Sequence, residues 1–215
     1  MTSLILPPDF NNRSMAEAFC FYRDDFKWQV YPVHPPWAQV SDPGKQPAVK
    51  KWWTFDPQDC DIQVRFKNGR SFNIGLAPRG GLVVVDLDSK QDQGASVAKF
   101  LSEHPDLAKY PYHITRGGVH LVFWCVDLPR WLKANGQPYE KALESQINTA
   151  VSAELFHSDH SNIVLPPSVH LSGFIYCWQN HGAIPEVSWK WLQDTFGFTA
   201  PAQERRQEKK NKEFP

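Results

Sequence analysis

The sequence of 215 residues has few cysteines, no excess charge of either sign and no long apolar run. Its four cysteines are widely spaced and form no CxxC pair, which argues against a zinc ribbon and a disulfide framework. The formal net charge is zero, so no global field attracts the chain to a polyanion, and any such partner must be held by a local basic surface. No apolar segment reaches the length of a membrane span, and the N-terminus lacks the parts of a signal peptide. We therefore expect a reducing, cytoplasmic location and no membrane partner.

The remaining composition is that of an ordinary globular protein with many aromatic residues, and a chain of this length can bury a substantial core. Periodicity and turn signals predict strands at 29–33, 71–76, 81–88, 119–126, 151–156, 162–165 and 173–178. The same signals predict helices at 14–27, after Asp56, at 95–104, at 139–147 and at 186–196. Most links between strands are too short for crossovers. The pattern therefore predicts an α+β fold with a mixed, largely antiparallel sheet and flanking helices.

The chain is expected to form one folded domain over residues 1–199, followed by a polar tail at residues 200–215. The tail has almost no apolar residues, so we expect it to be disordered or to act as a linker. Such a tail also leads us to expect a longer protein that continues beyond residue 215.

Two aspartates end the most apolar strand of the sequence. Asp86 and Asp88 follow the run Leu82–Val85, and a strand's period of two places both carboxylates on one face. Adjacent anions repel each other unless a cation lies between them, and oxygen ligands suit Mg²⁺ or Mn²⁺. The alternative is that Asp86 is a solvated strand end and Asp88 begins a turn.

Three further features carry chemistry in the second half of the chain. The turn Gly117–Gly118 delivers His120 at the start of a strand, where an imidazole can bind a phosphate oxygen; a partly buried structural histidine is the alternative. Glu154 is a carboxylate within a strand-like segment, and it could instead face outward. The loop Pro166–His170 is a rigid element that could form a pocket wall.

A loop rich in proline, lysine and aromatic residues occupies residues 35–53. Lys45, Lys50 and Lys51 could bind DNA by holding its phosphates there, with aromatic side chains nearby for stacking. Solvated loop lysines are the alternative for each of them.

Six motifs now occur in a fixed order along the chain. They are GKQP (44–47), NIGL (73–76), VVVDLD (83–88), GGVH (117–120), the strand carboxylate Glu154 and PPSVHLSG-x-x-Y-x-W (166–178). This series resembles the bifunctional DNA primase/polymerase N-terminal domain (prim-pol) of the archaeo-eukaryotic primase superfamily, over roughly residues 20–180. The resemblance implies a prim-pol catalytic core with an RRM-like half in the domain 1–199.

The resemblance also implies roles for individual residues. Asp86, Asp88 and Glu154 match the carboxylates that hold two catalytic Mg²⁺ or Mn²⁺ ions, although the family more often has aspartate at the third position. Asp159 could be that third carboxylate instead. His120 matches the histidine that contacts the phosphates of the incoming nucleotide. Further nucleotide-pocket residues with this implied role are Arg79, Arg116, Ser168 and His170.

The implied activity is template-dependent nucleotidyl transfer, with a single-stranded DNA template and primer and with NTPs or dNTPs as substrates. The family further implies replication of a plasmid, phage or mobile element, with a helicase domain or replication protein after residue 215. Two alternatives use the same sequence features: a metal-dependent nuclease or phosphohydrolase, and a non-catalytic nucleic-acid-binding module. A zinc site is not expected, because His157-x-x-His160 has no cysteine pair beside it.

Overall fold

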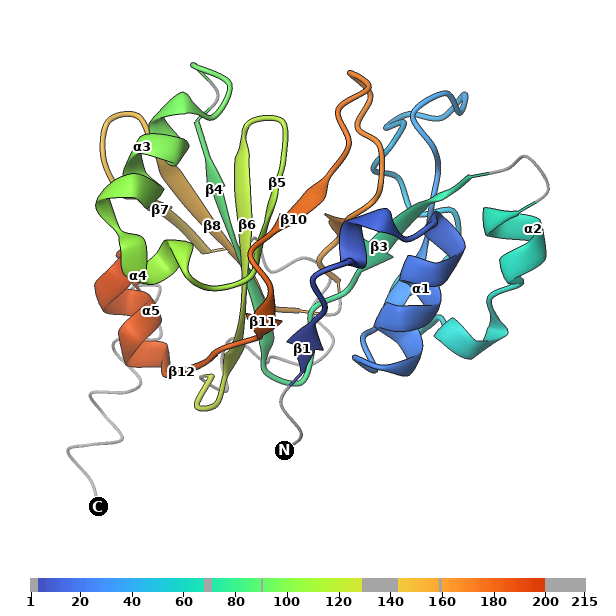
Figure 1. The fold of residues 1–215 in the computed structure, drawn as a ribbon, viewed down its shortest axis with the longest axis horizontal. Helices are drawn as coiled ribbons and strands as arrows, with labels where there is room; N and C mark the ends of the chain where they lie inside the picture. The colour runs from blue at the N-terminus through green and yellow to red at the C-terminus, as the bar shows by residue number, and fades with distance from the viewer. Residues whose placement is uncertain (1–3, 68–70, 90, 129–142, 159, 200–215) are drawn as a thin grey trace.

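The computed structural model describes residues 4–67, 71–89, 91–128, 143–158 and 160–199 (Figure 1). It has an α+β fold with mostly antiparallel sheets, as the sequence predicts. The strands are β1 (Ile5–Leu6), β2 (Val30–Val33), β3 (Asn73–Leu76), β4 (Leu82–Asp88), β5 (Tyr112–Ile114), β6 (Gly118–Cys125), β7 (Leu143–Gln146), β8 (Ser152–Phe156), β9 (Ile163–Leu165), β10 (Cys177–Gln179), β11 (Gly182–Ala183) and β12 (Glu186–Val187). The α-helices are α1 (Met15–Asp24), α2 (Ile62–Phe66), α3 (Ala95–Glu103), α4 (Pro105–Ala108) and α5 (Trp189–Phe196), and three 3₁₀ turns lie at Phe10–Asn12, Trp52–Thr54 and Pro57–Asp59.

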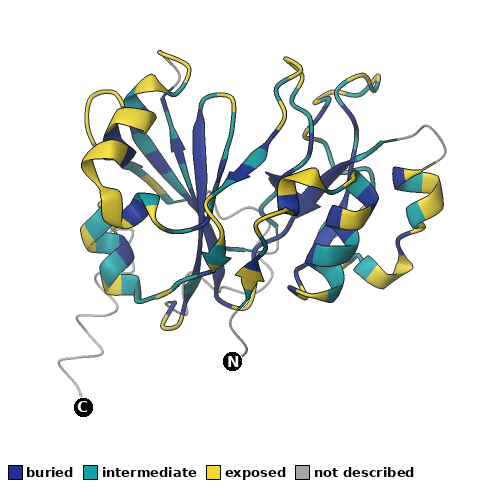
Figure 2. Ribbon diagram, in the orientation of Figure 1, coloured by how far each residue is buried: buried dark blue, intermediate teal, exposed yellow. Residues whose placement is uncertain are grey.

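The larger sheet has the strand order β10-β5-β6-β4-β8-β7, with β12 added parallel to β6. Helices α3, α4 and α5 cover one face of this sheet (Figure 1). Val83, Val85 and Leu87 of β4 pack against those helices, whereas Leu82 and Val84 join a second core on the opposite face. The apolar run of β4 is therefore explained by burial on both faces. The central strands β4 and β6 of the sheet are almost entirely buried (Figure 2).

The smaller sheet, in the order β2-β3-β9, lies on the other side of the second core and packs with α1. Strand β2 is the last strand of this sheet in the described residues, and its other side has only a bridge from Val33 to Pro47. Pro32 is accommodated there because its carbonyl accepts from the Ala48 amide at 2.9 Å and no partner strand needs an amide proton from it. After β9 the chain enters the Pro166–Pro167 loop, and the buried Tyr22 hydroxyl donates to the Pro166 carbonyl at 2.9 Å. The loop is thereby fixed to α1.

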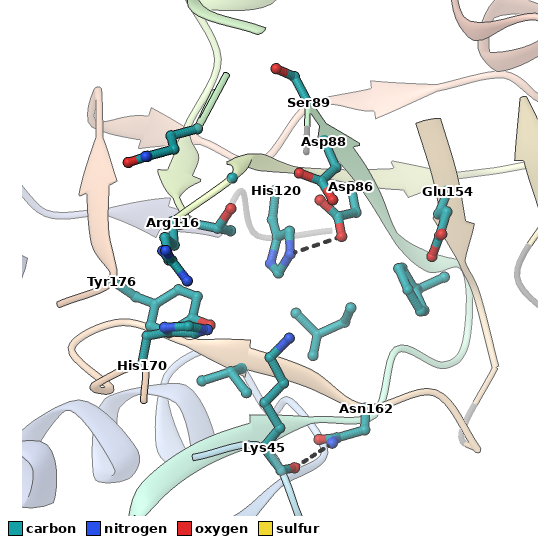
Figure 3. Close-up of a pocket in the computed structure, with 16 residues that line it drawn as sticks. Lys45, Asp86, Asp88, Ser89, Arg116, His120, Glu154, Asn162, His170 and Tyr176 are labelled. Atoms are coloured by element: carbon teal, nitrogen blue, oxygen red, sulfur yellow. Dashed lines mark hydrogen bonds and ion pairs between the residues drawn. The ribbon is translucent and has the colours of Figure 1, made fainter. Parts of the chain in front are cut away.

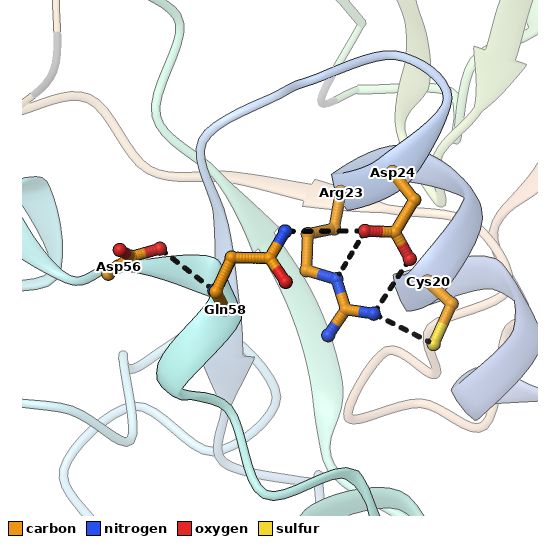
Figure 4. Close-up of polar contacts among 5 residues, drawn as sticks. All are labelled: Cys20, Arg23, Asp24, Asp56 and Gln58. Carbon is orange, nitrogen blue, oxygen red and sulfur yellow. Dashed lines mark hydrogen bonds and ion pairs between the residues drawn. The ribbon is translucent and has the colours of Figure 1, made fainter.

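Helix α1 begins with a capping box, in which Ser14 and Glu17 satisfy each other's backbone amides. At its C-terminal end Arg23 donates two hydrogen bonds to Asp24, at 2.7 and 2.8 Å (Figure 4). Asp24 also accepts from the side chain of Gln58 at 3.3 Å, and Asp56 caps the 3₁₀ turn that contains Gln58. These contacts attach the 57–59 turn to α1.

Some predicted elements differ from the structure. The helix predicted after Asp56 is divided into the turn 57–59 and α2, because Asp56 and Asp61 each cap a separate N-terminus. The strand predicted at 173–178 is shorter, since β10 begins only at Cys177. The helix predicted from residue 186 begins at Trp189, where Ser188 caps it, and the two residues of β12 pair with β6 instead.

The helix predicted at 139–147 is wrong in its described part, because Leu143–Gln146 form β7 and pair with β8. The backbone pairing with β8 outweighs the local helical pattern. The tail 200–215 lies outside the described residues. No helix in the described ranges is both long enough and apolar enough to cross a membrane.

Candidate active site between the two sheets

The predicted site residues Asp86, His120 and Glu154 lie in one row across the larger sheet. Asp86 of β4 is the register partner of His120 on β6 and of Glu154 on β8. Register partners in an antiparallel pair face the same side, with Cβ atoms about 5 Å apart. Asp88 lies two residues further along β4 and therefore faces the same side. The three carboxylates and the imidazole are thus assembled by strand pairing.

This row opens into a pocket of about 500 Å³ between the two sheets. The larger sheet contributes Asp86, Asp88, His120 and Glu154, and the segments next to β9 and β10 contribute residues such as Asn162 and His170 on the opposite wall (Figure 3). The pocket begins where the apolar residues of β4 give way to its two aspartates. The second core therefore forms its closed end.

The carboxylates Asp86, Asp88 and Glu154 form the acidic wall of the pocket (Figure 3). Their oxygen atoms are the ligand type that Mg²⁺ and Mn²⁺ prefer. As placed, no group of three or more histidine, cysteine or acidic side chains in the described part of the chain lies close enough to hold one ion. The donor chemistry and the shared face fit divalent cations, and side-chain rotation would have to bring the oxygens together.

The turn between β5 and β6 supports this acidic wall. A Cβ atom on Gly117 would lie 2.4 Å from the Asp88 side chain, and one on Gly118 would lie 1.8 Å from the Leu87 carbonyl oxygen. Only glycines allow the turn to approach β4 this closely. The side chain of Asp88 is consequently packed directly against the backbone of the turn.

Basic groups form the facing wall of the pocket. The Lys45 ammonium points inward from the 34–50 loop, and Arg116 and His170 lie to one side of it (Figure 3). Partial burial lowers the pKa of His170, and the positive charges of Lys45 and Arg116 lower it further. These three groups therefore lie close enough to interact electrostatically, and the pocket has an acidic and a basic side.

His120 lies between the two sides of the pocket. Its Nε2 atom is 3.5 Å from a carboxylate oxygen of Asp86, and its Nδ1 atom contacts His113 on the neighbouring strand β5. The side chain is mostly buried, so its ring has little freedom to reorient. An imidazole held here can form a hydrogen bond to a ligand that spans the acidic and basic walls.

The sequence model of the bifunctional DNA primase/polymerase N-terminal family matches residues 21–189. The chain belongs to this family. Membership in the prim-pol family indicates a primase/polymerase nucleotidyltransferase, and prim-pol enzymes generally use divalent metals. A search of curated proteins gave no match.

Tyr176 and Asn162 are among the residues of this prim-pol pocket that were not singled out from the sequence. Tyr176 is buried beside it, and burial, with the negative charges of Asp86 and Asp42, raises the pKa of its phenol to about 12. Asn162 donates to the Lys45 carbonyl at 2.7 Å and accepts from the Tyr31 hydroxyl at 2.7 Å. Tyr176 belongs to the last prim-pol motif, which was a usable signal, but nothing local distinguishes Asn162.

Four predicted residues do not line the pocket. Arg79 is exposed in the turn before β4, at the opposite end of that strand from Asp88. Ser168 is buried and its hydroxyl accepts from the Ile74 amide at 2.9 Å, so it attaches the 166–170 loop to β3. Lys50 and Lys51 are exposed on the 34–53 loop. Contacts of these residues with nucleotide or DNA stay predictions, and Asp159 lies outside the described residues.

Proposed function

We propose that this prim-pol domain is a template-dependent DNA primase/polymerase that uses two Mg²⁺ or Mn²⁺ ions on Asp86, Asp88 and Glu154. The observation that carries the proposal is the division of one pocket into an acidic and a basic wall. A metal-bound triphosphate has the complementary arrangement, with cations at one side and phosphate oxygens at the other. His120 lines the same pocket and lies next to Asp86 of the acidic wall.

The carboxylates of the acidic wall would hold the ions. Two divalent ions held there would supply activation of the primer 3′-hydroxyl and neutralisation of the triphosphate charge. Asp86 lies at the centre of the row, because Glu154 is its register partner and Asp88 follows on the same face. Glu154 fills the third position, for which Asp159 is the alternative.

The basic wall would hold the triphosphate. Lys45, Arg116 and His170 supply positive or donor groups, and His120 approaches from the floor. Nucleotidyl transfer requires little from the protein beyond positioning and charge stabilisation. Lys45 is thus assigned to the nucleotide, whereas the sequence pattern favours a contact with DNA.

Lys50 and Lys51 are proposed to contact the DNA template and primer. They follow Lys45 on the same loop and are exposed, as groups that contact a phosphate backbone must be. Replication of a plasmid, phage or mobile element, with a helicase or another replication protein as partner, belongs to the same proposal. Its support is the family alone.

The decisive experiment is extension of a labelled primer on a longer DNA template with dNTPs and Mg²⁺ or Mn²⁺. The variants Asp86→Asn and Asp88→Asn should abolish extension, whereas Asp106→Asn, an exposed carboxylate on α4, should retain it. Unprimed template with NTPs then tests priming. Shortening of the primer would instead establish a nuclease, and binding of DNA without any metal-dependent reaction would indicate a non-catalytic module.

A further inference from the structure

A second histidine lies beside His120 on the neighbouring strand β5 and does not line the pocket. His113 of β5 is the register partner of His120, and the two rings meet edge to face with centroids 4.5 Å apart. The His113 Nε2 atom is 3.1 Å from the His120 Nδ1 atom. His113 has no exposed surface, and its other neighbour across the sheet is the buried Trp178, with ring centroids 4.9 Å apart.

One proton lies between the two rings, and it can belong to either of them. If it is on His113 Nε2, His120 accepts at Nδ1 and carries its own proton on Nε2. If it is on His120 Nδ1, a neutral His113 must carry its proton on Nδ1 instead. In the first arrangement the His120 Nε2 atom presents an N–H donor to the pocket. In the second, with a neutral His120, the same atom presents a lone pair.

The surroundings of His113 favour the first arrangement. Its Nδ1 atom is buried and has no hydrogen-bond partner. Leaving a buried polar group unpaired costs its desolvation, and in protein interiors N–H groups without an acceptor are rarer than acceptors without a donor. Burial, and to a smaller extent the neighbouring His120, hold the pKa of His113 well below its usual value, so His113 stays neutral and has one proton to place.

The pocket side of His120 favours the same arrangement independently. Its Nε2 atom faces a carboxylate oxygen of Asp86 at 3.5 Å. An N–H group directed at a carboxylate is attracted, and a lone pair in the same position is repelled. Both ends of the histidine pair therefore select a proton on His113 Nε2 and a proton on His120 Nε2.

We propose that His113 is a positioning residue: its Nε2–H donates to His120 Nδ1 and fixes His120 as a ring that presents an N–H donor to the pocket. The role at the ligand rests on the proposed function, in which that donor addresses a phosphate oxygen of the incoming nucleotide. His113 itself touches neither nucleotide nor metal. It acts by holding the orientation and the tautomer of the ring that does.

The direct test is NMR of ¹⁵N-histidine-labelled, nucleotide-free protein at neutral pH. We expect a scalar coupling across the N–H···N bond between the two rings, with the directly attached proton on His113 Nε2 and a second proton on His120 Nε2. The variants His113→Gln and His120→Asn assign the signals. A proton bound to His120 Nδ1, or no coupling, overturns the proposal, and neither result depends on activity.

The functional test compares two replacements of similar shape. Gln at position 113 keeps an N–H donor near the original Nε2 position, whereas Met removes it. Loss of one hydrogen bond to the positioned ring should raise the KM for the nucleotide about threefold to tenfold in His113→Met. In His113→Gln the KM should stay close to the wild-type value. Equal effects of the two replacements would overturn the positioning role.

His157→Gln supplies the control for loss of a buried histidine, because His157 is also buried but does not line the pocket. It should lower stability and leave the nucleotide KM unchanged; a raised KM in this control would overturn the reading of the position-113 variants. If the protein shows the predicted bond but neither binds nucleotide nor extends a primer, the proposed function is wrong and the positioning role is wrong with it. If it extends primers but lacks the bond, only the inference about His113 is wrong.

Discussion

At the scale of single residues, Lys45 and Lys50 separate nucleotide binding from DNA binding. Only Lys45 of the two lines the pocket, and both are exposed. We expect Lys45→Ala to raise the KM for the incoming nucleotide by about tenfold or more, because a charge-assisted contact with a phosphate is lost. Lys50→Ala should leave that KM nearly unchanged, weaken template binding for every sequence and reduce the salt dependence of binding by about one counterion.

Steady-state primer extension and template-binding titrations at several salt concentrations measure the two effects. In the reverse result, Lys50→Ala would raise the nucleotide KM and Lys45→Ala would weaken template binding. That result would assign Lys45 to DNA binding, as the sequence pattern predicts. Equal small effects of both would show that neither lysine touches a substrate.

The sequence predicts which side chains share a face where a strand pattern determines the direction of each side chain. Asp86 and Asp88 share a face because of the strand period, and Glu154 and His120 join them through register. Asn162 could not be found in this way, because its position in the pocket depends on contacts with Tyr31 and the Lys45 carbonyl. Such contacts join segments that are more than a hundred residues apart and have no local signal.

At the scale of elements, the β5–β6 turn distinguishes loss of fold from loss of site. Gly118→Ala places a Cβ against the Leu87 backbone, so it should lower the free energy of unfolding by about 3 kcal/mol. Gly117→Ala places its Cβ against the Asp88 carboxylate, a side chain that can move. It should change stability little, yet reduce metal-dependent extension strongly.

Denaturant unfolding and primer extension at varied Mn²⁺ concentration measure these outcomes. A higher Mn²⁺ concentration should partly restore primer extension by Gly117→Ala, because only the geometry of the metal-binding carboxylates is disturbed. If Gly117→Ala unfolds the protein as readily as Gly118→Ala, or retains full activity, then the turn does not act on the site through Asp88.

Asn73 joins the two loops that carry Lys45 and His170 of the basic wall. The side chain of this buried residue donates to the Gly44 carbonyl at 2.9 Å and the Val169 carbonyl at 2.8 Å, and it accepts from the Val169 amide at 2.9 Å. Asn73→Ala should therefore cost about 3 kcal/mol of stability and also raise the nucleotide KM, because Lys45 and His170 adjoin the loosened segments. Asn12→Ala, at an exposed asparagine, is the control for thermal unfolding and kinetics.

A normal nucleotide KM in a destabilised Asn73→Ala protein would show that the two loops hold their positions without this residue.

The sequence predicted β3 around Asn73 but not this role, since the pattern gives the strand and not its side-chain partners. The same limit explains β7. Its residues were predicted to be helical from local pattern, and pairing with β8 determines their conformation.

At the scale of the whole molecule, two cores share one central strand. Alternate residues of β4 pack toward the helices α3 to α5 and toward the small sheet, and the site lies where the second set becomes acidic. The α+β class was predictable from strand spacing. The placement of a separate three-stranded sheet opposite the site was not, because long-range pairing of β3 with β9 establishes it.

Burial of His113 in this framework predicts acid sensitivity of the whole fold. The pKa of His113 is lowered well below its usual value in the folded protein, chiefly by burial, so the unfolded chain binds a proton that the folded chain does not. The stabilising contribution is present above the unfolded pKa of about 6.5 and is lost as the pH falls below it, by at most about 1.4 kcal/mol per pH unit. His113→Gln removes this titration. Between pH 7 and pH 5 the wild type should therefore lose about 2 kcal/mol more stability than His113→Gln.

Urea unfolding at pH 5, 6, 7 and 8 measures the difference. Comparison with His113→Gln isolates His113 from other groups such as His170, whose pKa is also lowered and which is present in both proteins. His181→Gln, at an exposed position, controls for removal of a histidine as such. Parallel pH dependences in wild type and His113→Gln would mean that His113 gains a proton in the folded state, which contradicts a neutral His113 in the buried pair.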